Sequence, residues 1–289
     1  VHKNRVFASY TKEVTKDCWT TAVLSGELNN NTVDFEEVFS PQACVESGGE
    51  QSLFGDFNAR QSGGRMVVYD DDNIILTTGE FRARDLAQDI DSPLGKILKI
   101  NFKTKNFNVL SMGHRNPQGL LYNRDKEFLL SSEHGPQGGD EINLLKLDVE
   151  KILNFGWPIS SYGVHYLGRS NWIEEAKKNP FPEDVMKKKY ELYPFHKSHA
   201  DYGFEEPIKY FERSPGLSEI IHVDTNRYML STLKYHSIYT FNLNEKNEVV
   251  NLSKSYVGER IRDLAIDKVN KKIFLFMEDT ASIGVLDYS

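Results

Sequence analysis

The stretch Gln118-Gly-Leu-Leu-Tyr-Asn-Arg-Asp-Lys-Glu-Phe-Leu-Leu-Ser-Ser132 consists of an apolar run, a polar turn and a second apolar run. Short runs of apolar, β-branched and aromatic residues around a polar turn are typical of two antiparallel strands. The same arrangement recurs elsewhere in the chain, at Arg65–Gly79, Glu219–Thr232 and Arg262–Phe276. The sequence therefore predicts four copies of one strand–turn–strand unit.

Further strands are expected after these units, and their spacing indicates the fold. They fall at Gly95–Phe102, Glu141–Leu147, Ser237–Leu243 and Ser282–Tyr288. A period of roughly 40–50 residues with four strands per unit is typical of a β-propeller, whose blades must stack to bury their faces. A β-sandwich is the alternative, which the long regular period disfavours.

We therefore expect an all-β propeller in a single domain spanning residues 1–289, with about five blades visible. The N-terminal stretch supplies strands of one blade, at Arg5–Tyr10, Thr20–Leu28 and Val33–Phe39. An irregular insert of about 155–215 interrupts the repeat and contains a basic segment, Ile173–Tyr190, that we expect to be helical.

Composition excludes several classes of partner. The net charge is −7 with no basic cluster, which argues against nucleic acid and anionic membranes. No apolar run is long enough to span a bilayer. The two cysteines, Cys18 and Cys44, could form a disulfide, as in exported proteins, or remain two thiols.

Two segments have compositions that ordinary strands and loops do not require. They are Gly113–Gly119 and Ser132–Asn143, and Asn154–Pro158 and Ser160–Tyr166 follow them. Because the first two flank the strands of one unit, we expect them at the same end of the propeller. Their glycines and prolines leave carbonyl groups free to face a ligand or a hard cation. The alternative for each segment alone is a tight loop between blades.

Together these motifs resemble the soluble glucose and aldose sugar dehydrogenases that use pyrroloquinoline quinone (PQQ). The resemblance lies in the order and spacing of Gly-Gly-Arg, Thr-Thr-Gly-Glu, Leu-Gly-Lys-Ile-Leu, Gly-His-Arg-Asn-Pro-Gln-Gly-Leu, Glu-His-Gly-Pro-Gln-Gly-Gly-Asp-Glu-Ile-Asn and Gly-Trp-Pro within residues 61–166. It implies a six-bladed propeller with PQQ at the top of the axial channel. The family's opening strands would then fall before Val1. It also favours the disulfide and a periplasmic or secreted location.

The resemblance implies a role for each matched residue. Arg115 and Asn116 would meet the quinone edge, and the carbonyl groups of Gly135 and Pro136 would bind the activating Ca²⁺. Glu141 and the backbone at Phe155 resemble a second, structural Ca²⁺ site. The cofactor's three carboxylates would be held by Lys234, Arg260 and Arg262. In isolation, Lys234 would be a solvated lysine, and the two arginines would pair with Glu259 and Asp263.

One residue of the family pattern is missing. The family's general base is a histidine just before Gly-Gly-Arg, and here either Gln61 or Arg60 takes that place, depending on how the motif is aligned. Neither accepts a proton near pH 7. Glu80, in place of a carboxylate that the family has close to the site, is the candidate substitute.

Three functions follow as hypotheses. The first is oxidation of an aldose at C1 to its lactone, with hydride transfer to PQQ, Ca²⁺ as activator and an external electron acceptor. The second is a catalytically impaired propeller that binds a cofactor, calcium or a protein. The third, a Ca²⁺-dependent propeller hydrolase, would need side-chain carboxylates clustered at the axis.

Overall fold

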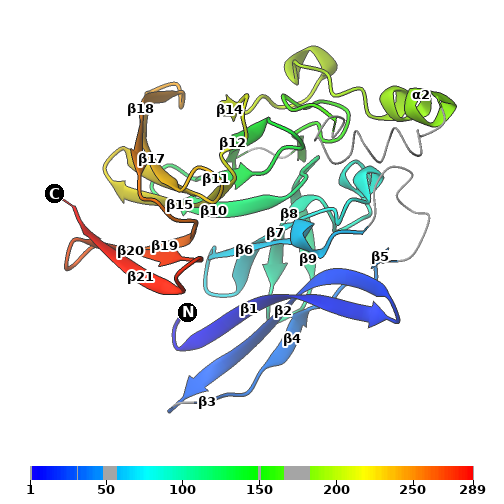
Figure 1. Ribbon diagram of the computed structural model, residues 1–289. Helices are drawn as coiled ribbons and strands as arrows, with labels where there is room; N and C mark the ends of the chain where they lie inside the picture. The colour runs from blue at the N-terminus through cyan, green and yellow to red at the C-terminus, as the bar shows by residue number, and fades with distance from the viewer. Residues whose placement is uncertain (1, 31, 48–56, 149–150, 166–182, 289) are drawn as a thin grey trace.

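The computed structural model describes residues 2–30, 32–47, 57–148, 151–165 and 183–288. Their strands form five sheets, which are mostly antiparallel. The sheets follow one another around a common centre, from the blue N-terminal sheet to the red C-terminal one (Figure 1). The all-β propeller is confirmed. The five sheets agree with the number of blades visible in the sequence and are one fewer than the six that the family resemblance implies.

Each predicted strand–turn–strand unit is a hairpin that begins a sheet. The second sheet has the order β13-β9-β8-β7-β6, the third β10-β11-β12-β14, the fourth β15-β16-β17-β18 and the fifth β19-β20-β21. The hairpins are β6 (Gly63–Val68) with β7 (Asn73–Thr78), β10 (Pro117–Asn123) with β11 (Phe128–Glu133), β15 (Leu217–Asp224) with β16 (Arg227–Thr232), and β19 (Ile261–Asp267) with β20 (Lys272–Met277).

The outer strands complete these sheets. Those expected from the sequence are β8 (Lys96–Asn101), β12 (Asp140–Lys146), β17 (Ser237–Leu243) and β21 (Ser282–Asp287). Four more are β9 (Phe107–Met112), β13 (Leu153–Asn154), β14 (Lys209–Phe211) and β18 (Val249–Tyr256).

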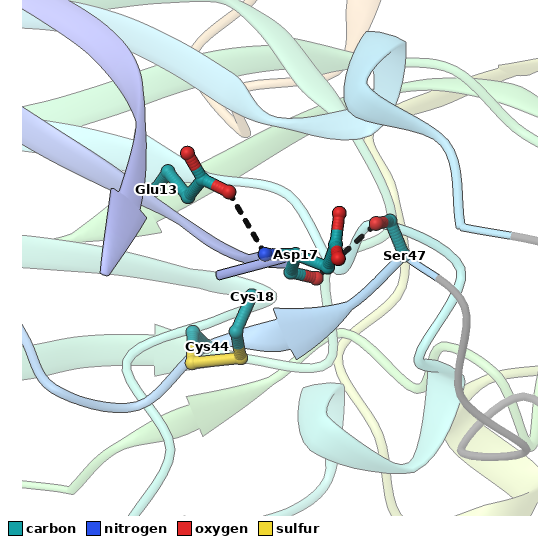
Figure 2. The surroundings of a disulfide bond; sticks show 5 residues. All are labelled: Glu13, Asp17, Cys18, Cys44 and Ser47. Carbon is teal, nitrogen blue, oxygen red and sulfur yellow. Dashed lines mark hydrogen bonds between the residues drawn. A yellow bond between two sulfur atoms is a disulfide. The ribbon is translucent and has the colours of Figure 1, made fainter. Parts of the chain in front are cut away.

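The first sheet is built on the long hairpin of β1 (Arg5–Thr15) and β2 (Cys18–Asn29), to which β3 (Thr32–Val33), β4 (Glu36–Phe39) and β5 (Val45–Glu46) add. A disulfide joins Cys18 to Cys44, with Cα atoms 5.4 Å apart, and so attaches the segment before β5 to the start of β2. Figure 2 shows the adjoining turn, where the amide N–H of Asp17 donates to Glu13 at 2.8 Å and the Ser47 hydroxyl donates to the Asp17 carbonyl at 3.2 Å.

The span of about 155–215 is irregular, as expected. Its described part contains the helix α2 (Glu183–Leu192), a 3₁₀ turn at Ala200–Tyr202 and β14. The predicted helical segment Ile173–Tyr190 thus coincides with α2 only at its C-terminal end, and its first part lies outside the described residues. None of the helices in the described ranges has both the length and the apolar content needed to cross a membrane.

Hydrophobic clusters lie between adjacent sheets. Ile220, Tyr228 and Phe241 of the fourth sheet pack on Leu130 and Ile142 of the third. Leu264, Ile273 and Leu275 of the fifth sheet pack on Ile221 and Val223 of the fourth, and the other clusters join the first three sheets in the same way. Face-to-face packing of twisted sheets is what holds a propeller together.

The opposite face of the fifth sheet is apolar and open. Phe274 pairs with Val285, and Phe276 pairs with Ile283, so these side chains share the face turned away from the fourth sheet. Ile283 and Val285 are 60% and 51% exposed. This outer face has no hydrophobic cluster upon it among the described residues.

Candidate active site

The predicted motif segments meet at one end of the propeller. Pro117, at the start of β10, pairs with Glu133, at the end of β11, so the segments on either side of this hairpin lie together. The amide N–H of Glu80 donates to the carbonyl of Arg115 at 3.2 Å, which joins the end of the second sheet to the start of the third. The expectation that both segments lie at the same end is confirmed.

A chain of hydrogen bonds connects Glu80, Gln61 and Arg115. With the Gln61 amide oriented so that both its ends are satisfied, its nitrogen donates to Glu80 Oε1 at 2.6 Å and its oxygen accepts from Arg115 Nη2 at 3.0 Å. All three residues are buried. Arg115 Nη1 donates to the carbonyl of His134 at 2.9 Å, so the guanidinium spans both loops of the site.

Close backbone approach makes this arrangement possible. The amide N–H of Phe81 donates to the Gln61 carbonyl at 3.0 Å. A Cβ atom on Gly79 would lie 2.0 Å from that carbonyl oxygen, so only glycine fits there. Arg60, the other candidate for the histidine position, has an exposed side chain. The geometry therefore places Gln61, and not Arg60, beside Arg115 and Glu80.

Glu80 has an unusual environment. Its side chain is fully buried, and its Oε2 atom has no hydrogen-bond partner among the described residues. Burial raises the pKa of Glu80 to about 7, although Arg115 and Arg84 act to lower it. The next two residues, Phe81 and Arg82, have φ angles of 51° and 74°. Left-handed backbone at bulky residues is strained, and such strain gathers at functional sites.

Arg84, a residue that the sequence analysis missed, adds positive charge to this site. Its guanidinium carbon lies 5.4 Å from the ring centre of Trp157, 5.3 Å from Tyr193 and 5.6 Å from Phe195. Arg115 lies at 5.4 Å from the same Trp157 ring. Cation–π contacts hold both arginines in place, and both act on the charge of Glu80.

The side chain of Asn116 is engaged by the protein. Its nitrogen donates to the carbonyl of Arg60 at 3.2 Å, and its oxygen accepts from the amide N–H of Gly63 at 3.2 Å and from Gln118 at 3.0 Å. Asn116 thus holds the short 3₁₀ turn of Ala59–Gln61, and with it the position of the Gln61 side chain.

Of the three basic residues assigned to the cofactor carboxylates, Lys234 lies in the loop between β16 and β17, Arg260 directly precedes β19, and Arg262 lies within β19. Lys234 is exposed. Arg260 Nε and Arg262 Nη2 both contact Glu278 Oε2, at 3.3 and 2.8 Å. Pairing of these arginines with Glu259 and Asp263 is therefore wrong, because the β19–β20 register brings Glu278 beside them. Two guanidinium groups thus share one carboxylate.

The Gly135–Pro136 loop suits a hard cation. The amide N–H of Gly135 donates to Asp140 Oδ1 at 3.1 Å, and Asp140 Oδ2 accepts from the amides of Gly216 and Leu217 at 2.8 and 3.2 Å. These bonds hold the loop against the start of β15. No backbone N–H group of the described residues donates to the carbonyl groups of Gly135 and Pro136, and carbonyl oxygens are ligands that Ca²⁺ favours.

The predicted second calcium site has a different occupant. His199 Nδ1 donates to the carbonyl of Phe155 at 2.9 Å, and His199 Nε2 lies 3.5 Å from Glu141 Oε1. Burial raises the pKa of Glu141. Although burial alone would lower the pKa of His199, the adjacent Glu141 carboxylate raises it. The expected ligands thus face an imidazole ring, and no signal near His199 in the sequence indicated this.

An arginine occupies the propeller axis. Arg65 Nη1 lies 2.7 Å from Glu219 Oε2 and 2.9 Å from Asp263 Oδ2, and Arg65 Nε donates to the carbonyl of Gln118 at 3.0 Å. Burial raises the pKa of Glu219 to about 8, against the lowering effect of Arg65. Two carboxyl groups that the sequence analysis missed therefore lie together here, and one guanidinium bridges them. The described residues contain no group of three His, Cys, Asp or Glu side chains that could hold a metal.

Comparison with known proteins identifies the family. The family model described as Glucose / Sorbosone dehydrogenase matches residues 1–180. The aldose sugar dehydrogenase YliI of Escherichia coli is 26% identical over 284 residues, which cover 90% of this chain and 67% of the relative. The quinoprotein glucose dehydrogenase B of Acinetobacter calcoaceticus is 32% identical over 125 residues, which cover 33% of this chain and 25% of that protein.

Solved structures share the fold. The soluble aldose sugar dehydrogenase of Escherichia coli in its apo form superposes with a TM-score of 0.73 at 23% identity, over 99% of this chain and 79% of that one. The PQQ-bound aldose sugar dehydrogenase of Streptomyces coelicolor superposes with a TM-score of 0.64 at 19% identity, over 95% and 69% of the two chains. On the match over 180 of its 289 residues, this chain belongs to the glucose/sorbosone dehydrogenase family and so to the oxidoreductases.

Proposed function

We propose that this protein oxidises an aldose sugar at C1 to the lactone, using PQQ and Ca²⁺, in the periplasm or outside the cell. The observation that supports this most directly is the hydrogen-bonded chain of Glu80, Gln61 and Arg115. It places a buried carboxyl group with a pKa of about 7 next to a guanidinium at the expected cofactor site. A base with a pKa near the working pH is what proton abstraction requires.

The residues present fit the cofactor. When bound, PQQ would supply the two-electron acceptor for the hydride from C1, activated by Ca²⁺, and would pass the electrons to an external acceptor. Arg115 would bind the quinone edge, and Gly135 and Pro136 would offer their free carbonyl groups to the cation. Lys234, Arg260 and Arg262 would hold the carboxylates of the cofactor. Arg260 and Arg262 would exchange their contact with Glu278 for this interaction.

Glu80 would serve as the general base in place of the family histidine. Glu80 Oε2, which has no hydrogen-bond partner among the described residues, would take the proton of the sugar's O1 hydroxyl, and the bound cofactor would accept the hydride from C1. Gln61 holds the other oxygen of Glu80, so the carboxylate is oriented. Arg84 and Arg115 favour the ionised form of Glu80 and so oppose the effect of burial.

A second function is favoured by a specific observation. The Glu80 side chain is completely shielded from solvent, and Gln61, which cannot titrate, lies between it and Arg115. This arrangement would suit a propeller that binds PQQ, calcium or a protein without turnover.

A titration with PQQ distinguishes the dehydrogenase from the binding module. PQQ is added to the protein in the presence of Ca²⁺ while the cofactor's absorbance is recorded, and aldoses are then added. We expect saturable binding and then reduction of the quinone by an aldose, with reduction at least about 10²-fold slower in Glu80→Gln. Binding without reduction would favour the binding module. Absence of binding would contradict both cofactor assignments.

A further inference from the structure

The most informative cluster outside the proposed chemistry surrounds His199. We propose that the His199 imidazole fills the second, structural calcium site that the family resemblance assigns to Glu141 and Phe155, and that it keeps a cation out of that site. The ring takes the place of a cation, because it lies between a carboxylate of β12 and the backbone of the segment after β13. This inference does not depend on the proposed function.

The two expected ligands are both directed at the ring. The Phe155 carbonyl accepts from Nδ1 at 2.9 Å, and Glu141 Oε1 lies 3.5 Å from Nε2. A Ca²⁺ ion needs oxygen ligands at about 2.3–2.6 Å and takes about six to eight of them. No ion can contact both the carbonyl and the carboxylate at that distance while the ring stays between them.

The neighbouring polar groups are also occupied. Asn143 Nδ2 donates to Glu133 Oε1 at 3.0 Å and lies 3.5 Å from Glu141 Oε2, the second oxygen of the expected ligand. Asn143 Oδ1 is the one oxygen of this group without a hydrogen-bond partner among the described residues. A single neutral oxygen falls far short of the number that calcium takes.

The protein holds the ring firmly in place. His199 is 1% exposed, and its ring stacks on that of Tyr162 with centres 5.2 Å apart. Glu206 Oε1 accepts from the backbone N–H groups of His199 and Ala200 at 2.8 and 2.9 Å. A Cβ atom on Gly156 would lie 3.0 Å from His199 Nδ1, so the glycine makes room for the ring. Ejection of the ring would break its stacking on Tyr162 and its hydrogen bond to the Phe155 carbonyl.

The backbone of the Gly135–Pro136 loop differs from that of the His199 site. Those two carbonyl groups accept no hydrogen bond from a backbone N–H group of the described residues. The chain therefore offers free backbone ligands at one of the two expected calcium sites and an occupied pair at the other.

Calcium stoichiometry tests this inference. The protein is stripped with a chelator and then dialysed to equilibrium against radioactive Ca²⁺, alongside Glu141→Gln. We expect at most one bound ion per chain and no change in Glu141→Gln. Two ions, or one ion that is lost in Glu141→Gln, would overturn the inference. Zero bound ions would leave it standing and would instead contradict the calcium part of the proposed function.

A second readout needs no variant. Long-range ¹H–¹⁵N spectra of the histidine rings report the protonation of Nδ1 and Nε2 in the intact protein. We expect the His199 signals to stay unchanged when Ca²⁺ is added to saturation. A Ca²⁺-dependent change of those nitrogen shifts would show that the ring leaves or is replaced, and the inference would fail.

Discussion

Gln61 donates a hydrogen bond of 2.6 Å to Glu80, and the two side chains form one buried unit. An amide that cannot titrate stands where the family resemblance expects a basic imidazole, and it orients a carboxylate whose pKa lies near 7. In the proposed function, the proton is therefore accepted by Glu80, the hydrogen-bond partner of Gln61, and not by residue 61 itself. Each of these two residues can be tested separately.

Replacement of Gln61 by histidine should raise turnover. A positioned general base contributes about 10²–10⁴-fold, so Gln61→His should increase kcat by at least about 10-fold in a dye-linked assay of aldose oxidation. Arg60→His is the matched control, because the Arg60 side chain is exposed, and it should leave kcat unchanged. A gain in Arg60→His alone would assign the base position to residue 60.

The pH dependence of turnover should follow Glu80. Because its pKa is about 7, the carboxylate form increases as the pH rises through 7, and kcat/KM should rise with it and then level off. Glu80→Gln should remove this limb from the pH–rate profile. A limb that persists in Glu80→Gln would belong to another group.

Stability provides an independent check on the same carboxyl group. The pKa of Glu80 is about 7 in the folded protein, compared with 4.5 for an unperturbed glutamate. The stability that this group contributes is therefore fully present below pH 4.5 and is lost as the pH rises through 7. Relative to the native protein, Glu80→Gln should therefore be more stable to urea at pH 8 than at pH 5. The same relative stability at both pH values would show that Glu80 titrates normally.

Removal of the axial guanidinium should destabilise the fold. Arg65 is shared by Glu219 and Asp263, and Arg65→Gln leaves these two carboxyl groups close together without a cation. Breaking a largely buried ion pair costs about 3 kcal/mol or more in the free energy of unfolding. Lys272→Ala, which removes the exposed pair with Asp287, should cost less than about 1 kcal/mol. If both variants lost the same free energy of unfolding in urea, the Arg65 ion pairs would contribute no more than an exposed pair.

The disulfide should stabilise the first sheet. Cys18 and Cys44 are 26 residues apart, and closing a loop of this length removes chain entropy worth about 3.5 kcal/mol from the unfolded state. The double variant Cys18→Ser with Cys44→Ser should lose about that much in denaturant unfolding. Addition of a reductant should lower the stability of the native protein but not that of the variant.

The fold was predictable because its pattern is local. Each hairpin, such as Gln118–Ser132, shows apolar runs around a polar turn, and four copies at similar spacing indicate stacked blades. Strand β18 was less visible, because most of its side chains are exposed and its sequence lacks an apolar run. The pairing that makes it a strand comes from β17.

The candidate site was predictable only in part, for a physical reason. Arg115 and Glu80 each belong to a short contiguous motif, so each was visible in the sequence, although they lie at the ends of two different sheets. His199 and Arg84 act through contacts with Glu141, Phe155 and Trp157, which lie far away along the chain. No local pattern marks a contact of that kind. The contact of Arg260 and Arg262 with Glu278 was not foreseen for the same reason, since Glu278 approaches only through strand pairing.

The open face of the fifth sheet has a consequence for the order in which the molecule unfolds. This sheet has three strands, packs on the fourth sheet through one face and leaves Phe276, Ile283 and Val285 exposed on the other. A unit that buries only one of its faces is expected to open at a lower free energy than the rest. Amide hydrogens of β20 and β21 should then exchange before those of β7 and β8, and the opened strands would present apolar edges to other molecules.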